Sequence, residues 1–137
     1  MPDRGPPRGV LDTSVVIDFE RVAWDQLPDE LAIAAVTLAE LAAGPHATTD
    51  PIERARRVTL LQRVEATFDP LPFDAEAARA YGLVYASVAA AGRRARGQRA
   101  VDLLIAATAV SARLPLYTKN PADFAHLGGV LEVVPVA

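Results

Sequence analysis

Short apolar runs alternate along the chain with longer segments whose apolar residues recur at helical spacing. Runs of the first kind lie at residues 9–12, 31–36, 116–118 and 130–136, and their length is typical of buried strands. The run at 31–36 is also compatible with the start of a helix, because periodicity does not separate the two for so few residues. The alternation predicts an α/β fold with a largely parallel sheet.

The first two helices are expected to be short. Ser14 is placed to cap a helix over residues 15–22. Thr37 and Glu40 have the spacing of a capping box, in which each side chain bonds the backbone of the other, and they predict a helix over residues 38–43. On this motif alone, Glu40 is as readily a capping residue as a ligand.

Longer helices follow from residue 50 onward. Asp50 is a helix cap followed directly by proline, and Asp74 caps an Ala-rich helix that reaches about residue 91. The apolar segment 101–113 carries Asp102 in its first turn. Between these last two helices lies a cluster of arginines, namely Arg93, Arg94, Arg96 and Arg99. Such a run is usually a solvated loop, and the functional alternative is contact with phosphate groups of a nucleic acid.

Composition limits the class of protein. The chain has 137 residues, of which 51% are hydrophobic and 23% charged, which fits one globular domain over residues 9–137 behind a polar tail over residues 1–8 that we expect to be flexible. The absence of cysteine excludes disulfides and thiolate metal sites. No apolar run is long enough to span a bilayer and the first residues do not resemble a signal peptide, so we expect a cytoplasmic protein without membrane contact.

Four acidic residues fall near the carboxyl ends of the expected strands, where ligands bind in open α/β sheets. Asp12 ends the first strand, Glu40 follows the second apolar run, Asp102 starts the helix before the next strand, and Asp123 follows that strand. Carboxylates held close together repel one another, and a hard cation such as Mg²⁺ or Mn²⁺ removes that cost. Such a metal can activate water for attack on a phosphodiester. Each acid taken singly is as readily a cap or turn residue.

Four strings resemble, in the same order, the four motifs of the PIN-domain family. The strings are Val10-Leu-Asp12-Thr-Ser-Val-Val-Ile-Asp18, Thr37-Leu-Ala-Glu40-Leu41, Val101-Asp102-Leu-Leu-Ile-Ala-Ala-Thr-Ala109 and Tyr117-Thr118-Lys-Asn120-Pro-Ala-Asp123-Phe124. Together they extend over nearly the whole chain. The compact size and the Asp-Thr-Ser form of the first string are most similar to the VapC branch, the toxins of VapBC toxin–antitoxin pairs.

The resemblance implies a single PIN-like domain with a sheet in the order 3-2-1-4-5 and helices on both faces. It implies an endoribonuclease that depends on Mg²⁺ or Mn²⁺, inhibits translation and growth, and is neutralised by a VapB-type antitoxin. Metal-ligand roles pass to Asp12, Glu40 and Asp102. The last acid stays open, because relatives carry it either where Asn120 stands or where Asp123 stands; we place Asp123 in the site and Asn120 beside it.

Thr13, Ser14 and Thr118 are expected to support the carboxylates with hydrogen bonds from their hydroxyls. The expected partners are an RNA substrate, a second copy of the chain and the antitoxin, through which alone DNA would be bound. Two alternatives stay open: a PIN nuclease that processes RNA without an antitoxin, and a PIN fold that binds RNA or protein without cleavage. A phosphatase of the haloacid dehalogenase kind is set aside, because it needs a second acid at the position of Ser14.

Overall fold

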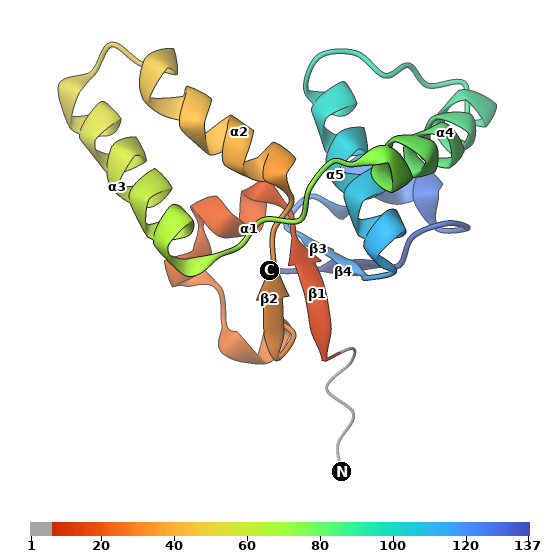
Figure 1. The fold of residues 1–137 in the computed structure, drawn as a ribbon, viewed down its shortest axis with the longest axis horizontal. Helices are drawn as coiled ribbons and strands as arrows, with labels where there is room; N and C mark the ends of the chain where they lie inside the picture. Colours follow the sequence, from red (N-terminus) through yellow and green to blue (C-terminus); the bar gives the residue numbers. More distant parts are fainter. Residues whose placement is uncertain (1–6) are drawn as a thin grey trace.

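The computed structural model describes residues 7–137 and places a parallel sheet at the centre, between helices (Figure 1). The strands are β1 (Arg8–Leu11), β2 (Glu30–Ala32), β3 (Leu116–Thr118) and β4 (Val133–Pro135). Every pair is parallel, and the order across the sheet is β2-β1-β3-β4. The predicted α/β fold is therefore confirmed. Of the expected tail, residues 1–6 lie outside the described residues, and Arg8 is already part of β1.

The sheet has four strands where the order 3-2-1-4-5 requires five, so the expected strand count is wrong by one. The missing outer strand is reduced to a single residue, because Leu71 makes one isolated parallel bridge to Ala34 beside β2. The N–H of Leu71 donates to the carbonyl of Ile33 at 2.8 Å. Pro70 and Pro72 flank Leu71 and have no N–H to extend the ladder. The remaining strands keep the expected order.

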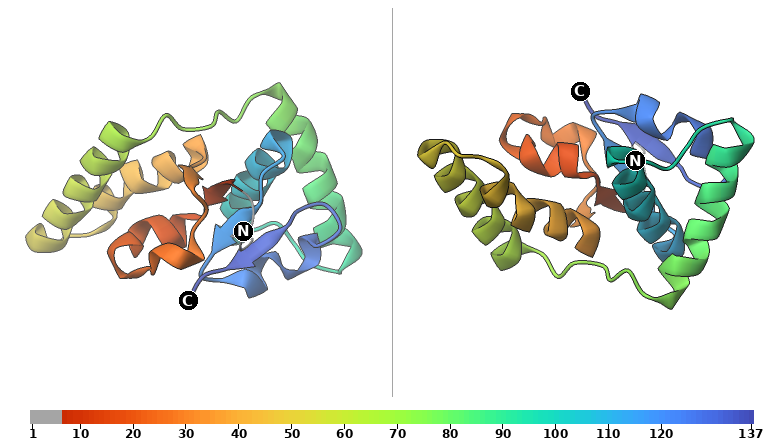
Figure 2. Two further views of the ribbon diagram at one scale, coloured as in Figure 1. Left: turned by 90° about the horizontal axis from the view of Figure 1, so that it is seen from below. Right: turned by 90° about the horizontal axis from the view of Figure 1, so that it is seen from above.

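The helices form two arms on either side of the sheet, as Figures 1 and 2 show. One arm consists of α2 (Ala35–Ala43) and α3 (Pro51–Thr67), and the other of α4 (Ala75–Ala90) and α5 (Gln98–Ala112). The short helix α1 (Thr13–Ile17) lies between them at the end of β1. Short 3₁₀ segments complete the fold: η1 (Phe19–Arg21), η2 (Trp24–Gln26), η3 (Gly44–Ala47) and η4 (Pro121–Leu127). No helix in the described part of the chain is long and apolar enough to cross a membrane.

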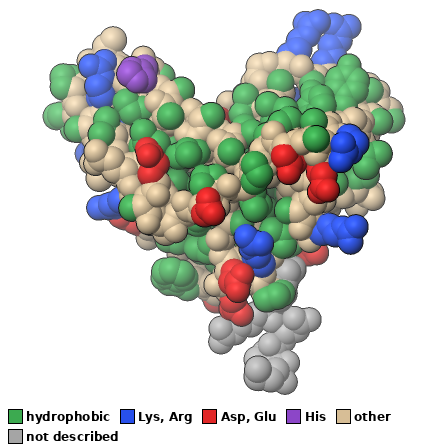
Figure 3. All heavy atoms as spheres, viewed as in Figure 1, with side chains coloured by type: hydrophobic (Ala, Val, Ile, Leu, Met, Phe, Trp, Pro, Cys, Tyr) green, Lys and Arg blue, Asp and Glu red, His purple; other side chains and the backbone are tan. Residues whose placement is uncertain are grey.

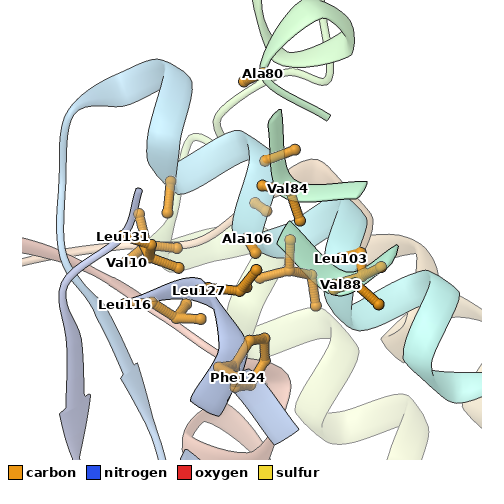
Figure 4. Packing of buried hydrophobic residues seen from close by; sticks show 14 of the residues in the cluster. Val10, Ala80, Val84, Val88, Leu103, Ala106, Leu116, Phe124, Leu127 and Leu131 are labelled. Atoms are coloured by element: carbon orange, nitrogen blue, oxygen red, sulfur yellow. The ribbon is translucent and has the colours of Figure 1, made fainter. Parts of the chain in front are cut away.

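The sheet separates two hydrophobic cores, one for each arm. Val10 and Leu116 face the core that α4 and α5 cover, together with Phe124 of η4 (Figure 4). Leu11 and Tyr117, the next residue of each strand, face the core beneath α1, α2 and α3. This alternation is the two-residue period of a β-strand buried on both faces. The alternation sets the orientation of both central strands, β1 and β3. It therefore also determines where the residues that follow these strands leave the sheet.

Two predicted helix caps are confirmed. Oδ1 of Asp50 accepts the N–H of Ile52 at 3.0 Å at the start of α3. Oδ1 of Asp74 accepts the N–H of Ala77 at 3.0 Å at the start of α4. In both cases the partner is two or three residues away, so the local sequence contains the whole signal.

Three other predicted helix starts are wrong. Helix α1 begins at Thr13, so Ser14 lies inside it and is not its cap. Helix α2 begins at Ala35, so Thr37 and Glu40 do not form a capping box. Helix α5 begins at Gln98, which puts Asp102 in its second turn. At the first two of these starts, Ser14, Thr37 and Glu40 have partners far away in the sequence, whereas Asp102 is bonded by Gln98 of its own helix.

Candidate metal centre

All four predicted acids line one small pocket between the two arms. The pocket has a volume of about 230 Å³ and lies past the carboxyl ends of β1 and β3. Figure 3 shows a hollow between the two lobes of the molecule. The lining residues are Asp12, Thr13, Ser14, Ile17, Glu40, Gln98, Asp102, Asn120 and Asp123. Asp12, which follows β1, and residues of α1, α2, α5 and η4 that are far apart in the sequence thus share one site.

Asp12 follows the last residue of the central strand β1 and is only 4% exposed. Its Oδ2 accepts two hydrogen bonds, from Oγ of Ser14 at 2.8 Å and from Oγ1 of Thr118 at 2.9 Å. Its backbone N–H donates to the carbonyl of Tyr117 in the neighbouring strand at 2.8 Å. Within residues 7–137, no donor reaches Oδ1, so this oxygen remains available to a ligand.

The two hydroxyls on Asp12 are themselves held in orientation. Oγ of Ser14 accepts the N–H of Lys119 at 3.2 Å, and Oγ1 of Thr118 accepts the N–H of Asn120 at 3.0 Å. A hydroxyl has one proton, so a hydroxyl that accepts from the backbone has that proton free for the carboxylate. The structure therefore places Ser14 and Thr118 where the sequence expects them, in contact with the first acid.

Glu40 reaches the pocket from α2, in the opposite arm to Asp102. Its Oε1 accepts a hydrogen bond from Oγ1 of Thr13 at 2.6 Å, and its Oε2 accepts one from Nε2 of Gln98 at 3.1 Å. Oγ1 of Thr13 also lies 3.0 Å from Oγ1 of Thr37, which is fully buried. Both oxygens of Glu40 are thus engaged, and Thr13 contacts an acid of the site as expected.

Asp102 is 9% exposed and accepts one hydrogen bond, on Oδ1 from Nε2 of Gln98 at 3.1 Å. Burial raises the pKa of the Asp102 carboxyl to about 6. The hydrogen bond from Gln98 lowers this pKa, and the negative charges of Asp12, Asp123 and Glu40 raise it further. A buried carboxylate among like charges lacks a counter-charge, which is the electrostatic situation that a divalent cation relieves.

Asp123 and Asn120 both line the pocket from the segment after β3. The side chains of both are exposed, and the N–H of Asp123 donates to the carbonyl of Asn120 at 3.0 Å. The charge of Asp123 acts on Asp102, which places it within electrostatic reach of the other acids. That Asp123 completes the site, with Asn120 beside it, stays a prediction.

Gln98 is a pocket residue that the sequence reasoning missed. It stands four residues before Asp102, and residues at this spacing share one face of a helix. The signal was hidden because the helix was expected to begin at residue 101. Gly97, with a φ of 55°, is the cap residue that precedes α5, and the helix begins at Gln98.

The arginine cluster lies beside the pocket in sequence and not in its lining. Arg93, Arg94 and Arg96 are exposed in the loop between α4 and α5, and Arg99 is in the first turn of α5. Among the described residues that line the pocket, none of these four is included. Figure 3 shows basic side chains projecting from the lobe that contains α4 and α5. Their contact with phosphate stays a prediction.

The donor set fits a hard divalent cation. It consists of carboxylate oxygens, the ligands that Mg²⁺ and Mn²⁺ prefer, in a pocket large enough to keep several waters. Asp12 keeps Oδ1 and Asp102 keeps Oδ2 without a donor in the part of the chain that the structure describes. Within that part, no three acidic or histidine side chains already stand in position around one point. A cation bound by three of these carboxylates together would therefore need side-chain rotation.

A second, larger hollow adjoins the acidic pocket. It has a volume of about 1740 Å³ and lies between α1, the segments η1 and η2, and the arm of α2 and α3. Its lining includes exposed apolar side chains, with Trp24 74%, Ile52 68% and Ile17 60% exposed. Thr13, Ile17 and Glu40 line both hollows, so the groove opens directly onto the acidic pocket.

Comparison with known proteins gives consistent matches over almost the full length. The model of the PIN domain family matches residues 9–130. Ribonuclease VapC5 of Mycobacterium tuberculosis (strain ATCC 25618 / H37Rv) is 41% identical over 131 residues, which cover 93% of each chain. Ribonuclease VapC of Rickettsia bellii (strain RML369-C) is 35% identical over 133 residues, covering 93% of this chain and 95% of the relative.

Solved structures give the same result for the fold. The crystal structure of VapBC-5 from Mycobacterium tuberculosis, a member of the VapBC family of toxin–antitoxin systems, matches with a TM-score of 0.84 and 41% identity. The match covers 96% of this chain and 100% of that one. VapBC2 from Rickettsia felis, bound to a DNA fragment from its promoter, matches with a TM-score of 0.70 at 19% identity, covering 95% and 99%. At that identity the likeness concerns the fold alone.

Proposed function

The chain belongs to the PIN-domain family, and from this premise we propose that it is a VapC-type toxin, an endoribonuclease that a VapB-type antitoxin neutralises. We further propose that cleavage depends on Mg²⁺ or Mn²⁺. One observation carries the proposal: four acidic residues from four separate elements line a single pocket of about 230 Å³. The 41% and 35% identity to two ribonucleases named VapC, over nearly the full chain, supports the same reaction class.

Asp12, Glu40 and Asp102 would hold the cation, and Asp123 or Asn120 would complete the site. When bound, Mg²⁺ or Mn²⁺ would polarise a phosphoryl oxygen and lower the pKa of a water for attack on phosphorus. The residues of the chain prepare this chemistry. Two hydroxyls on Asp12 fix one ligand, and the ring of negative charge around Asp102 raises the affinity of the pocket for a divalent cation.

RNA would lie across the hollow between the arms, with its backbone against the arginine loop. The loop that carries Arg93, Arg94 and Arg96 leads directly into Gln98, which lines the pocket. Phosphate contacts of this kind position a nucleic acid without reading its sequence. The arginines would therefore set affinity, and the pocket would set the site of cleavage.

The apolar groove beside the pocket is where we place the antitoxin. An apolar segment of the partner would cover Trp24, Ile17 and Ile52, which are otherwise exposed to water. Because Thr13 and Glu40 line both hollows, a basic side chain at the end of that segment would reach the acids and displace the cation. DNA binding would then belong to the antitoxin.

A second copy of the chain is the remaining expected partner. Leu83 and Tyr85 on α4 are 58% and 50% exposed, far from the apolar groove, and would be covered in a homodimer. Sedimentation of the chain and of Leu83→Asp tests this: the substitution should convert a dimer into a monomer. A wild-type chain that sediments as a monomer would contradict it.

Cleavage of a labelled RNA pool by purified, antitoxin-free protein tests the proposed reaction. Cutting should require Mg²⁺ or Mn²⁺, stop in EDTA, and be lost in Asp12→Asn and Asp102→Asn. The matched control is Asp69→Asn, because Asp69 is exposed and outside the pocket. Wild-type rates in both site variants would contradict the assigned site.

Expression in cells separates the remaining alternatives. A toxin expressed without its antitoxin should inhibit growth, and co-expression of the antitoxin should relieve this inhibition. RNA cleavage without growth inhibition would favour an RNA-processing PIN nuclease. RNA binding by folded protein without cleavage under either metal would favour a PIN fold that binds and does not cut.

A further inference from the structure

We propose that Gln98 is a positioning residue that competes with the divalent cation, holding Glu40 and Asp102 while the site is free of metal. The inference rests on the proposed metal site and adds a residue that regulates its occupancy. It makes cation binding an exchange, in which an amide leaves two carboxylates as a metal arrives.

The contacts of the Gln98 amide carry this inference. Its Nε2 donates to Oε2 of Glu40 and to Oδ1 of Asp102, in each case over 3.1 Å. An amide nitrogen has two N–H groups, so this one uses both on the two acids. The two carboxylates come from α2 and α5, which belong to opposite arms. The amide therefore bridges the hollow at the point where the two negative charges face each other.

A cation shared by these carboxylates needs the space that the amide occupies. The nitrogen lies within 3.1 Å of both oxygens, and a Mg²⁺ bound by Oε2 of Glu40 would have to approach that atom to about 2.1 Å, while Asp102 could bind the cation through its free Oδ2. Glu40 has no oxygen to spare, because Thr13 holds the other one at 2.6 Å. Binding of the cation by Glu40 and Asp102 together therefore displaces the Gln98 amide from Glu40, which is the carboxylate for which amide and cation compete.

The Gln98 side chain can move away from the two carboxylates. It is the first residue of α5 and its side chain is exposed, so the side chain can turn into solvent. The competing interpretation is that Gln98 only joins the two arms. In that case its removal would lower stability and weaken metal binding, whereas competition predicts tighter binding.

Direct measurement of Mn²⁺ binding distinguishes these interpretations without RNA. Free Mn²⁺ is followed by electron paramagnetic resonance in titrations of wild type, Gln98→Met and Gln98→Ala. Methionine keeps the length of the side chain and removes both donors, and circular dichroism checks that each variant is folded. Both variants should bind Mn²⁺ about tenfold more tightly, as expected for the loss of two competing hydrogen bonds to charged groups. Gln62→Ala, on the exposed face of α3, is the matched control and should bind like wild type.

Equal or weaker Mn²⁺ affinity in folded Gln98→Met would overturn the inference. The proposed metal site fails in a different way: wild-type protein would then not bind Mn²⁺ at all, or Asp102→Asn would bind it as well as wild type. A third result is that Mn²⁺ binding requires Asp102 but has the same affinity after loss of the Gln98 donors. That result would support the metal site and contradict only the competition between Gln98 and the cation.

Discussion

The two buried aspartates of the pocket, Asp12 and Asp102, are held in different ways. Asp12 follows the central strand β1, and two hydroxyls, one from α1 and one from β3, donate to the same carboxylate oxygen. Asp102 lies on a helix and accepts one bond, from the exposed side chain of Gln98. Both are almost fully buried, at 4% and 9% exposure, so burial alone does not distinguish them.

The difference follows from where each residue stands in the fold. The ends of β1 and β3 are tied by backbone hydrogen bonds, among them the bond from the N–H of Asp12 to the carbonyl of Tyr117. Helices α2 and α5 belong to separate arms, and their acids meet only through side chains. We therefore expect one half of the pocket to be fixed before a cation binds and the other half to adjust on binding. A site built in this way would bind metal tightly and still be open to a partner.

The largest expected effect on metal binding comes from removing a hydrogen bond that holds Asp12, in the fixed half of the pocket. Thr118→Val keeps the shape of a fully buried side chain and removes one donor from Asp12 and the acceptor for the N–H of Asn120. We expect Mn²⁺ affinity and RNA cleavage to fall by about 10- to 100-fold, the usual cost of losing a group that orients a metal ligand. Calorimetric titration with Mn²⁺ measures the first and a cleavage assay the second.

The matched control for that change is Thr59→Val, on the exposed side of α3, which should leave both quantities unchanged. Wild-type metal affinity in folded Thr118→Val would mean that Asp12 is not the fixed ligand, and the contrast between the two halves would fail.

Asp102→Asn is expected to stabilise the protein in EDTA. The folded-state pKa of Asp102 is raised from 3.8 to about 6, so the folded protein holds this proton more tightly than the unfolded chain does. The cost of ionising Asp102 is absent below about pH 4, develops as pH rises from about 4 to 6, and is complete above that range. At pH 7.5 the variant should be more stable by up to about 3 kcal/mol, because the shift is about 2 pKa units and each unit corresponds to about 1.4 kcal/mol.

Urea denaturation as a function of pH measures this difference. The gap between wild type and Asp102→Asn should close as the pH falls towards 4, and Mn²⁺ should stabilise wild type but not the variant. Asp69→Asn provides the exposed control. If the stability difference between the two proteins instead increased at low pH, the assigned direction of the Asp102 pKa shift would be wrong.

The smallest expected effect is on RNA affinity, through the loop that leads into the adjustable half. Replacing all three of Arg93, Arg94 and Arg96 by alanine should weaken RNA binding several-fold. It should also reduce the slope of log K against log[salt] by up to about 0.7 for each phosphate contact that is lost. Binding of Mn²⁺ should not change, because these side chains do not line the pocket. Fluorescence anisotropy with an uncleavable RNA at several salt concentrations measures it. Unchanged RNA binding by the triple variant would mean that the arginine loop is solvated and does not contact RNA.

The parts of the fold with local causes were predictable from the sequence. The helix caps Asp50 and Asp74 bond a backbone N–H two or three residues away, and the buried strand that ends at Asp12 is visible as an apolar run. The outer strand could not be judged in this way: the extended segment around Leu71 is visible, but the proline on each side leaves it a single bridge.

The polar contacts of the site could be predicted only in part. The four acids follow from motif order, yet Ser14 and Glu40 also satisfy local capping patterns, and their partners lie up to 105 residues away. Gln98 has no motif of its own and gains its role only when α2 and α5 face each other across the pocket. Long-range hydrogen bonds outweigh the local pattern at these residues, which is common where a fold assembles a functional site.

The most direct test of the acidic pocket as a metal centre is anomalous diffraction at the manganese edge from crystals of the protein grown with Mn²⁺. The expected result is a peak in the pocket bound by Asp12 and Asp102, with the Gln98 amide turned away from Glu40 and Asp102. A pocket without an anomalous peak at Mn²⁺ concentrations that support RNA cleavage, or a peak elsewhere on the protein alone, would contradict the assignment.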